Sequence, residues 1–338
     1  CPTYQLLGDE RDGPRGRIYL IKEMLENNTA SAETRLHLDR CLTCRACETT
    51  CPSGVEYNRL LEIGRSAVEK SVKRPLLQRL QRQALLRTVP DTRRFGLLLR
   101  LAKMLRPLLP AAQRNSIPVH RSSRGTGSTW PARPHPRKVL LLEGCVQSLT
   151  APDINLSTAR VLDKLGVQCV PAPGCCGALS HHLSDEHRTA VTVRRNIDRW
   201  WPMVEAGAEA LILTASGCAP TVRDYGHLLR DDPDYASKAA RLASMAQDIS
   251  QFLGQEELAC LESMPGTYGL VAFHSPCTLQ HGLKQAGSVE NLLTRLGFRL
   301  NKVQDSHLCC GSAGTYSILQ KKLSRQLLER KLDCLQRD

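Results

Sequence analysis

Four closely spaced cysteines at residues 41–52 form the segment of this chain that is best suited to chemistry. The sequence CLTCRACETTCP places Cys41, Cys44, Cys47 and Cys51 at C-x₂-C-x₂-C-x₃-C spacing, followed by proline. This spacing is an established ligand pattern for iron–sulfur clusters, in which the first three thiolates bind one cluster and the fourth binds another. The run predicts that three of these thiols converge on one [4Fe-4S] cluster, while Cys51 points elsewhere.

The chain begins with a second copy of the dipeptide that ends this run, Cys1-Pro2. In proteins with two such clusters, the cysteine before the proline serves the cluster of the other run. We therefore expect Cys1 to be the last residue of another cysteine run.

Zinc and disulfide bonds are the two alternatives for this cysteine run. Zinc sites usually pair two short Cys/His arms that are a dozen or more residues apart, whereas this run has three consecutive short gaps. A disulfide framework is disfavoured because the chain is 338 residues long, has an odd number of cysteines (15) and shows no secretory segment. We expect reduced thiols in a cytoplasmic protein.

The overall composition limits the classes of partner. Aromatic residues make up only 4% of the chain, which disfavours a base-stacking surface, and we expect no nucleic-acid partner. The net charge of +13 suits an anionic membrane face or an acidic protein. No apolar run reaches the roughly 18 residues that a bilayer span requires, so the protein is expected to be soluble or peripheral on the inner face of the cell membrane.

Two helical segments flank the cysteine run. Residues 17–27 carry apolar side chains at helical spacing, and a second helix is expected over residues 57–70. In the second helix, the side chains expected to face inward are Leu60, Leu61, Ile63 and Val68. Residues 1–70 would thus form a small helical [4Fe-4S] domain, whose thin core makes bound metal an important source of its folding free energy.

A basic, leucine-rich segment follows at residues 71–110. It predicts amphipathic helices broken at Pro90 and Pro107. These helices lie either on the protein's own core with a solvated basic face, or against a membrane surface or partner subunit. Residues 114–136 are rich in Pro, Gly and Ser, as in a linker, and complete a connecting segment over residues 71–136.

From Arg137 the pattern changes to alternating strands and helices. Short apolar strands are expected over residues 139–142, 167–170 and 210–213, with a helix over 154–165. Such alternation is typical of α/β units with parallel strands. The predicted fold class is therefore α + α/β, a small helical domain followed by a duplicated α/β region.

The α/β half contains an internal repeat with matching cysteines. In each copy a lone cysteine follows a strand and a Cys-Cys-Gly follows another extended segment, and the two copies are offset by 132 and 134 residues at these positions. The repeat cysteines are Cys145, Cys175 and Cys176 in the first copy and Cys277, Cys309 and Cys310 in the second. We assign the copies to residues 137–260 and 268–338 and expect their thiols at one edge of a sheet.

Each Cys-Cys-Gly is expected to lie on a turn, because adjacent strand residues face opposite sides and could not aim both thiols inward. Gly177 and Gly311 would permit that turn. Cys218, after the third strand, offers the first copy a fourth thiol. These thiols could hold an iron–sulfur or zinc centre; the alternatives are buried inert cysteines and a redox-active vicinal disulfide.

The remaining cysteines and the histidines near the repeat are weaker candidates. Three solitary cysteines outside the repeat are interpreted as structural: Cys169, Cys260 and Cys334. Four histidines lie near the repeat cysteines, but a chain with 10 histidines brings some there by coincidence: His181, His182, His274 and His281.

Several longer segments resemble a known family. They are CPTYQLLGDERDGPRGRIYLIKEML, LHLDRCLTCRACETTCPSGVEYNRLLEIGR, PGCCGALSHHL and HLCCGSAGTYS, with the tail SRQLLERKLDCL. Over nearly its whole length the chain resembles the iron–sulfur subunits of bacterial glycolate oxidases. They belong to a group that joins a ferredoxin-like domain to two cysteine-rich CCG domains, and this group also includes heterodisulfide reductase subunits, the lactate-utilisation iron–sulfur protein and the anaerobic glycerol-3-phosphate dehydrogenase C subunit.

The resemblance implies which thiols share a cluster. By the family's pattern, Cys1 joins Cys41, Cys44 and Cys47 on one [4Fe-4S] cluster, while Cys51 serves a second. The family normally has three further cysteines before Cys1 and a closing Gly-Cys segment beyond residue 338. We therefore expect a sequence that is incomplete at both ends, in which one ferredoxin-type ligand set is complete.

The resemblance also implies an electron-transfer function. Oxidation of a 2-hydroxy acid removes two electrons together, so the organic chemistry would belong to a flavin on partner glycolate oxidase subunits, and this chain would carry single electrons toward a membrane quinone. We expect no activity from the chain alone. Other readings remain open: the partner could oxidise lactate or glycerol-3-phosphate, the CCG domains could themselves reduce a disulfide, or the chain could be a zinc-dependent nucleic-acid binder.

Overall fold

The computed structural model describes residues 1–110, 114, 117, 129–261 and 269–336. Much of the expected linker over residues 114–136, and residue 268 at the expected start of the second repeat, lie outside the described residues. The chain forms two compact units, one of Cys1–Gln78 with Ser263–Asp338 and the other of Arg79–Glu262. Helices and parallel strands make up both, in agreement with the predicted α + α/β class.

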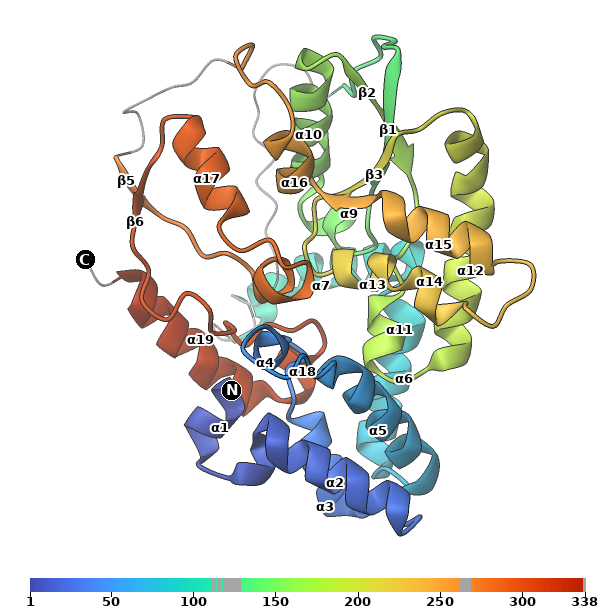
Figure 1. The fold of residues 1–338 in the computed structure, drawn as a ribbon, viewed down its shortest axis with the longest axis vertical. Coiled ribbons are helices and arrows are strands. Elements are labelled where there is room, and N and C mark those ends of the chain that lie inside the picture. The colour runs from blue at the N-terminus through green and yellow to red at the C-terminus, as the bar shows by residue number, and fades with distance from the viewer. Residues whose placement is uncertain (111–113, 115–116, 118–128, 262–268, 337–338) are drawn as a thin grey trace. The chain divides into compact units, whose positions relative to one another are not determined.

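The N-terminal part of the first unit is entirely helical (Figure 1). Its elements are α1 (Pro2–Leu7), η1 (Glu10–Asp12), α2 (Pro14–Glu26), α3 (Ala32–Asp39), α4 (Ala46–Thr49) and α5 (Tyr57–Ser71). Pro14 begins α2, where its missing N–H costs nothing, and the Ser31 hydroxyl caps α3 by accepting from the Thr34 amide. The two helices expected around the cysteine run are therefore present.

A small apolar core joins α2, α3 and α5. Ile21, Leu38, Leu61 and Val68 are almost completely buried there. Gly64 allows α5 to approach closely, because a Cβ at this position would lie 2.6 Å from Ile21 Cγ1. The expectation that Ile63 faces inward is wrong: 53% of it is exposed, because it lies two positions from Leu61 and thus on another side of the helix.

The C-terminal part of the same unit carries a two-stranded parallel sheet and a long helix. Its elements are β5 (Leu270–Ala272), η3 (Thr278–Gly282), α17 (Ser288–Arg295), β6 (Arg299–Asn301), α18 (Tyr316–Leu319) and α19 (Lys321–Gln336). Helix α19 lies beside α1, and the Arg330 guanidinium donates to the Gln5 side chain at 2.8 Å (Figure 1). The second cysteine-rich repeat thus belongs to the same compact unit as the N-terminal helices.

The second unit is built on a four-stranded parallel sheet with strand order β2-β1-β3-β4. Its strands are β1 (Arg137–Leu142), β2 (Val167–Ala172), β3 (Ala210–Leu213) and β4 (Ala246–Asp248). Its helices are α6 (Leu76–Thr88), most of which lies in this unit, α7 (Thr92–Leu105), η2 (Arg106–Leu108), α9 (Gln147–Thr150), α10 (Pro152–Lys164), α11 (Ala178–His182), α12 (Glu186–Glu205), α13 (Ala219–Arg223), α14 (Tyr225–Leu228), α15 (Ala236–Met245) and α16 (Ile249–Gly254).

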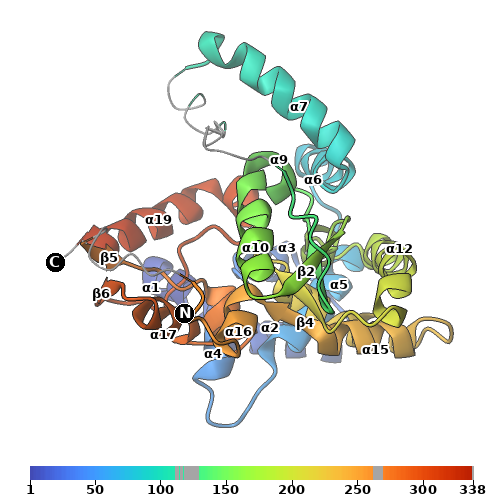
Figure 2. The ribbon, with the colours of Figure 1, turned by 90° about the horizontal axis from the view of Figure 1, so that it is seen from above.

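Helices cover both faces of this sheet (Figure 2). On one face Val139, Leu141 and Ile212 pack against α10 and α16. Successive strand residues face opposite sides, so Leu140 and Leu211 point to the other face of the sheet, and both are fully buried. Helices α12 and α15 lie on that face. The continuous apolar strands of the sequence are explained by this burial on two faces.

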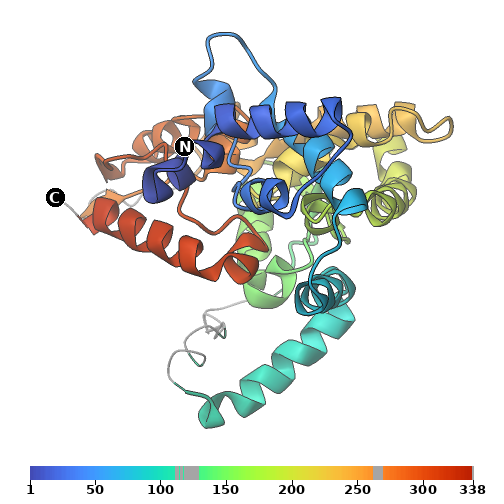
Figure 3. The same cartoon turned by 90° about the horizontal axis from the view of Figure 1, so that it is seen from below.

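The basic segment forms α6 and α7, and the helix break expected near Pro90 is present. Helix α6 is tied to its unit by Arg82, which donates to the Leu183 carbonyl at 2.9 Å. Helix α7 contains no buried residue and lies at the margin of the unit, beside α6 and α9 (Figures 2 and 3). The alternative in which the leucines of this segment face the protein's own core holds only in part for α7: Leu99 is partly buried, whereas Leu97, Leu98, Leu101 and Leu105 are exposed. None of the helices in the described ranges is both long and apolar enough to cross a membrane.

Candidate metal centres

Four cysteines of the first unit line one cavity. Cys1, Cys41, Cys44 and Cys47 contribute to its wall, together with Arg17 and other neighbouring residues. Cys51 does not line it, although it is only four residues from Cys47. The structure thus brings together the four cysteines that the sequence and the resemblance assign to one cluster and separates the fifth from them.

The loop between α3 and α5 is shaped so that its thiols converge. Helix α3 ends at Asp39, and Cys41 follows directly, buried at the start of the loop. Thr43 and Arg45 adopt left-handed backbone conformations, with φ of 55° and 59°. Such conformations are unfavourable for non-glycine residues and are kept where the surroundings or a function require them. They turn the chain sharply on either side of Cys44, before α4 carries Cys47.

Positive charge and a hydroxyl group surround Cys41. Burial opposes ionisation of this thiol, but the guanidinium groups of Arg17 and Arg65 outweigh it and lower its pKa. The Tyr57 hydroxyl lies 3.7 Å from Cys41 Sγ as a hydrogen-bond donor, and the Thr43 amide lies at 3.5 Å. Metal ligands must be thiolates, and this environment stabilises the thiolate form.

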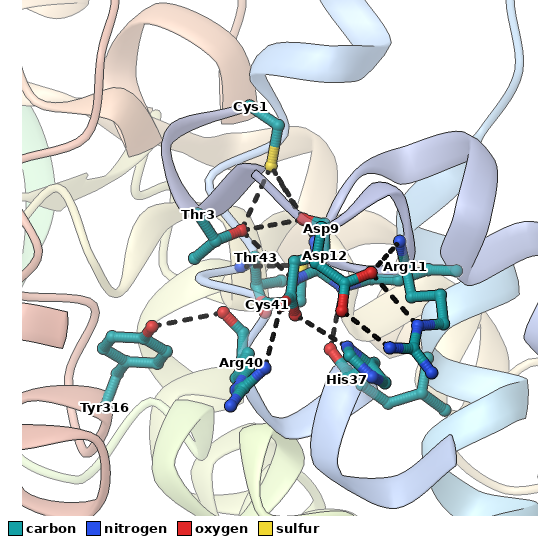
Figure 4. A network of polar contacts seen from close by, with 12 residues as sticks. Cys1, Thr3, Asp9, Arg11, Asp12, His37, Arg40, Cys41, Thr43 and Tyr316 are labelled. Atoms are coloured by element: carbon teal, nitrogen blue, oxygen red, sulfur yellow. Dashed lines mark hydrogen bonds and ion pairs between the residues drawn. The ribbon is translucent and has the colours of Figure 1, made fainter. Parts of the chain in front are cut away.

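Arg17 is held in place by a buried ion-pair network. Figure 4 shows other members of this network, Asp12, His37 and Arg40. Only 1% of Arg17 is exposed; it donates to the His37 carbonyl at 2.8 Å, to Thr3 Oγ1 at 3.1 Å and toward Cys1 Sγ at 3.8 Å. The fully buried Asp12 carboxylate pairs with Arg17 at 3.4 Å, with Arg40 at 2.9 Å and with His37 Nδ1 at 3.0 Å. The Asp12 carboxylate thus compensates part of the positive charge beside the thiols. Arg17 itself lines the cavity.

The other loop cysteines have different environments. Burial raises the pKa of Cys44 most, and the neighbouring Cys309 adds to this rise. Burial and then the charge of Cys41 raise the pKa of Cys47 to about 11. At Cys51, by contrast, the backbone amides of Val55, Ser53 and Gly54 lower the pKa. Binding a cationic centre would offset the burial at Cys44 and Cys47, since metal binding displaces the thiol proton.

In the second unit, four cysteines meet at the carboxyl edge of the parallel sheet. Cys145 follows β1, Cys175 and Cys176 follow β2, and Cys218 follows β3. These thiols are close enough to affect one another's ionisation, since Cys175 raises the pKa of both Cys145 and Cys176, and Cys218 adds to the rise at Cys176. Hydrogen bonds from Cys145 and Cys176 lower the pKa of Cys175 to about 3. The expectation that the repeat thiols lie at one sheet edge is confirmed for this copy.

Side chains from surrounding helices fix the Cys-Cys-Gly turn of the first repeat. Asn196 donates to the Cys175 carbonyl at 2.7 Å, Tyr225 to the Cys176 carbonyl at 2.9 Å, and Trp200 to the Pro173 carbonyl at 3.2 Å. Gly177 has a φ of 87°, so the turn depends on a left-handed glycine as predicted. Because three side chains hold its carbonyls, the turn presents its two thiols rigidly.

The second repeat places its cysteines in the first unit. Cys277 Sγ lies 3.7 Å from Cys309 Sγ. Cys309 raises the pKa of Cys310 to about 11, and His274 opposes this rise. The bond with Cys277 raises the pKa of Cys309 to about 12. Two buried polar atoms beside these thiols have no partner, His274 Nδ1 and Ser275 Oγ. Buried polar atoms normally have a partner, and a group bound at this site would supply one.

The second repeat packs directly against the N-terminal cysteine loop. Leu42, Cys309, Tyr316 and Leu327 form one buried cluster, and Cys44 and Cys277 pack against it. The Tyr316 hydroxyl donates to the Arg40 carbonyl at 3.2 Å, and Thr49 Oγ1 lies 2.8 Å from His281 Nδ1. The thiols of the second repeat are thus neighbours of the N-terminal loop, within one compact unit.

The spacing of the thiols can be compared with that of a single zinc site. Thiolates of a tetrahedral zinc site lie about 3.8 Å apart, given a Zn–S distance of about 2.3 Å. Among the described residues, which include all the cysteines, no three thiols lie within 4.8 Å of one another. The ligand atoms of Asp9, Asp12 and His37 do lie within 4.8 Å of one another, but Arg11 already pairs with Asp9 and Arg17 with Asp12.

The remaining candidates lie apart from these sites or play other roles. Cys169 is buried in the sheet core, Cys334 is buried in α19, and the exposed Cys260 lies 3.7 Å from the Lys164 carbonyl. His181 and His182 lie in α11, and His281 bonds Thr49 and the His307 carbonyl rather than a thiol. In the described residues, His274 acts on a repeat cysteine, since it tends to lower the pKa of Cys310.

The sequence did not point to the residues that support the thiols. Arg17, Asp12 and Tyr57 act on the N-terminal loop from three separate elements, and no local spacing connects them. The positions of Asn196 and Trp200 could be predicted in part. They are four residues apart in α12 and lie on the same face as the apolar Val193, and each carries a polar group that can form a hydrogen bond.

Comparison with known proteins gives matches to two domain families and a set of relatives. Residues 1–56 match the 4Fe-4S dicluster domain family, and residues 139–223 and 271–338 match the cysteine-rich domain family named CCG. The glycolate oxidase iron-sulfur subunit of Escherichia coli (strain K12) is 51% identical over 340 residues, which cover 99% of this chain and 82% of the relative.

Two further relatives are more distant. The probable glycolate oxidase iron-sulfur subunit of Bacillus subtilis (strain 168) is 28% identical over 98% of this chain and 80% of its own length. Lactate utilization protein A of the same organism is 25% identical over 59% of this chain and 82% of its own length.

Proposed function

Because this chain belongs to the family of glycolate oxidase iron–sulfur subunits, we propose that it carries electrons away from a flavin-binding partner that oxidises glycolate. The chain is an iron–sulfur subunit of an oxidoreductase. Oxidation of a 2-hydroxy acid releases two electrons together, and a flavin can accept the pair and pass electrons on singly. The chain alone would therefore not oxidise glycolate.

The cavity lined by Cys1, Cys41, Cys44 and Cys47 is the observation that carries this proposal. These four thiols would hold one [4Fe-4S] cluster, and Cys51 would serve a second. When bound, the cluster accepts and releases single electrons. Arg17 and Arg65 would stabilise its thiolates, because their positive charge already favours ionised Cys41.

The cysteine-rich repeats would provide further centres. In the second repeat the donors would be Cys277, Cys309 and Cys310, and in the first Cys145, Cys175, Cys176 and Cys218. The second set adjoins Cys44 within one compact unit, which supports an exchange of electrons with the N-terminal loop. A quinone in the membrane would be the final acceptor.

Metal analysis of cysteine variants tests the ligand assignment. We expect Cys44→Ser, purified without oxygen, to lose about four iron and four acid-labile sulfide ions relative to the unsubstituted chain, since one [4Fe-4S] cluster holds that number. Cys169→Ser is the matched control, because Cys169 is buried in the sheet core away from these sites. If Cys44→Ser keeps all its iron and sulfide, the proposed ligand set is wrong.

Reconstitution with flavoprotein tests the electron-transfer role. The chain should be reduced by glycolate only when glycolate oxidase flavin subunits are present, as followed by bleaching of its visible absorption. Reduction with the subunits that oxidise lactate instead would assign this chain to the other substrate. Reduction by glycolate without any flavoprotein would contradict the proposal.

A further inference from the structure

Helix α7 and the turn that follows it carry an exposed apolar stripe. Its members are Leu97 (59% exposed), Leu98 (48%), Leu101 (46%), Met104 (74%), Leu105 (53%) and Leu108 (82%). Their spacing of three and four residues places them on one side of the helix. Six large apolar side chains in one stripe go beyond the scattered exposed leucines of an ordinary protein surface.

The opposite side of α7 faces its own unit. Phe95, Gly96, Leu99 and Ala102 are the partly buried residues of the helix, and a Cβ at Gly96 would lie 3.7 Å from Leu149. This side already has its neighbour, although loosely, since a cavity of about 450 Å³ lies between α7 and Leu149. The exposed stripe is therefore a second apolar face, which the described residues of this unit leave uncovered.

The charges around the stripe are of one sign. Ten basic residues and one acidic residue occur between residues 73 and 106, and the acidic one, Asp91, caps α7 by accepting from the Arg93 and Arg94 amides. Within α7 itself Arg93, Arg100 and Lys103 flank the stripe, and the helix contains no acidic residue. This surface is complementary to an anionic layer that also offers an apolar interior.

We propose that α7 lies in the surface of an anionic bilayer, with the stripe inserted among the acyl chains and the flanking cations at the headgroups. Amphipathic helices that bind membrane surfaces combine leucine-rich faces with Lys and Arg in this way. A protein partner is favoured less, because the stripe offers no polar atom for the directional hydrogen bonds of a specific interface. The proposal concerns where the subunit binds and does not depend on the substrate of its flavoprotein partner.

Vesicle sedimentation with the whole cluster-containing chain tests this. The chain should sediment with vesicles of phosphatidylglycerol and phosphatidylcholine, weakly with phosphatidylcholine alone, and less in roughly 0.5 M salt, where charges are screened over a few ångströms. The double variant Leu101→Glu, Leu105→Glu should bind anionic vesicles at least about tenfold more weakly, since each leucine loses its favourable burial. Its iron content, circular dichroism and electron transfer to a soluble dye should be unchanged.

Leu328→Glu is the matched control, because Leu328 is 47% exposed on α19, nearly the same as Leu101. It should bind vesicles like the unsubstituted chain. The proposal is overturned if the unsubstituted chain ignores anionic vesicles or if the double variant binds them normally. Loss of co-purification with the flavoprotein in the double variant, with vesicle binding intact, would identify the stripe as a protein interface instead.

Discussion

The two cysteine-rich repeats place the same Cys-Cys-Gly turn in different surroundings. Both turns use a left-handed glycine, Gly177 with φ of 87° and Gly311 with φ of 83°. In the first repeat the turn is held by hydrogen bonds from Asn196, Trp200 and Tyr225, all within its own unit. In the second repeat the turn packs against α19 and against the N-terminal cysteine loop. The repeat thus preserves the arrangement of thiols but not the contacts that support it.

The two repeats have the same cysteine pattern in the sequence but differ in which parts of the chain support their thiols. The first repeat supplies all four of its thiols and the supports of its turn from one unit, so its site is self-contained. The second repeat has its thiols beside Cys44 and shares a buried cluster with Leu42. Under the proposed function, the second site would therefore depend on the N-terminal centre for its stability.

Removal of iron should have the largest effect and should affect the two units unequally. Chelation under reducing conditions should lower the protection of α5 and α19 amides from hydrogen exchange by about 100-fold or more, because metal binding supplies folding free energy and each 1.4 kcal/mol is a factor of ten. The strands β1 and β3, which have a fully buried apolar core, should keep their protection. Hydrogen exchange measured by mass spectrometry tests this. An equal loss of amide protection in both units would show that they do not differ in their dependence on metal.

Substitution of the two turn glycines by alanine should have the next largest effect. Gly311→Ala should cost about 2–5 kcal/mol in the free energy of unfolding, because its Cβ would lie 2.5 Å from the Ser324 carbonyl oxygen, in addition to the left-handed strain. Gly177→Ala should cost only about 1–2 kcal/mol, since its Cβ would find no atom closer than 3.8 Å. Denaturant unfolding of both variants provides the test, and equal costs would show that α19 yields to the added methyl group.

Two tyrosines allow a smaller, matched comparison. Tyr225→Phe should cost about 1–3 kcal/mol, because it leaves the buried Cys176 carbonyl without its donor. Tyr316→Phe should cost about 0.5–1.5 kcal/mol, because it removes a less buried bond to the Arg40 carbonyl. Electron paramagnetic resonance should show Tyr225→Phe altering the signal of the first repeat and Tyr316→Phe that of the N-terminal centre. If Tyr225→Phe altered the N-terminal signal and Tyr316→Phe that of the first repeat, the assignment of the two tyrosines would be wrong.

The smallest expected effect concerns the reduction potential. Tyr57→Phe removes a hydrogen bond to Cys41 sulfur, whereas Tyr225 bonds a carbonyl and not a sulfur. Hydrogen bonds to the sulfurs are among the factors that set cluster potentials. Loss of about 1 kcal/mol of such stabilisation lowers a one-electron potential by on the order of 40 mV, which a redox titration can measure. An unchanged potential in Tyr57→Phe would mean that the bond does not act on the centre.

Much of the local structure could be predicted from the sequence. The strand at residues 210–213 and the helix beginning at Tyr57 were predicted at the positions where they occur, because continuous apolar runs and helical periodicity are local signals. The left-handed glycines of the two turns were also predicted, since only a turn could present two adjacent thiols. Ile63 was misplaced because its apolar character says nothing about which helix faces have neighbours.

The sequence by itself determined the chemistry of this protein, because cysteine spacing within a dozen residues and the repeated Cys-Cys-Gly are fixed along the chain. Only the tertiary structure decided which distant groups surround those thiols. Arg17 reaches Cys1, Asn196 braces Cys175, and Cys309 packs beside Cys44, across 16, 21 and 265 residues of chain respectively. Such contacts depend on how whole elements pack, and the same local pattern is compatible with many packings, so no spacing rule could specify them.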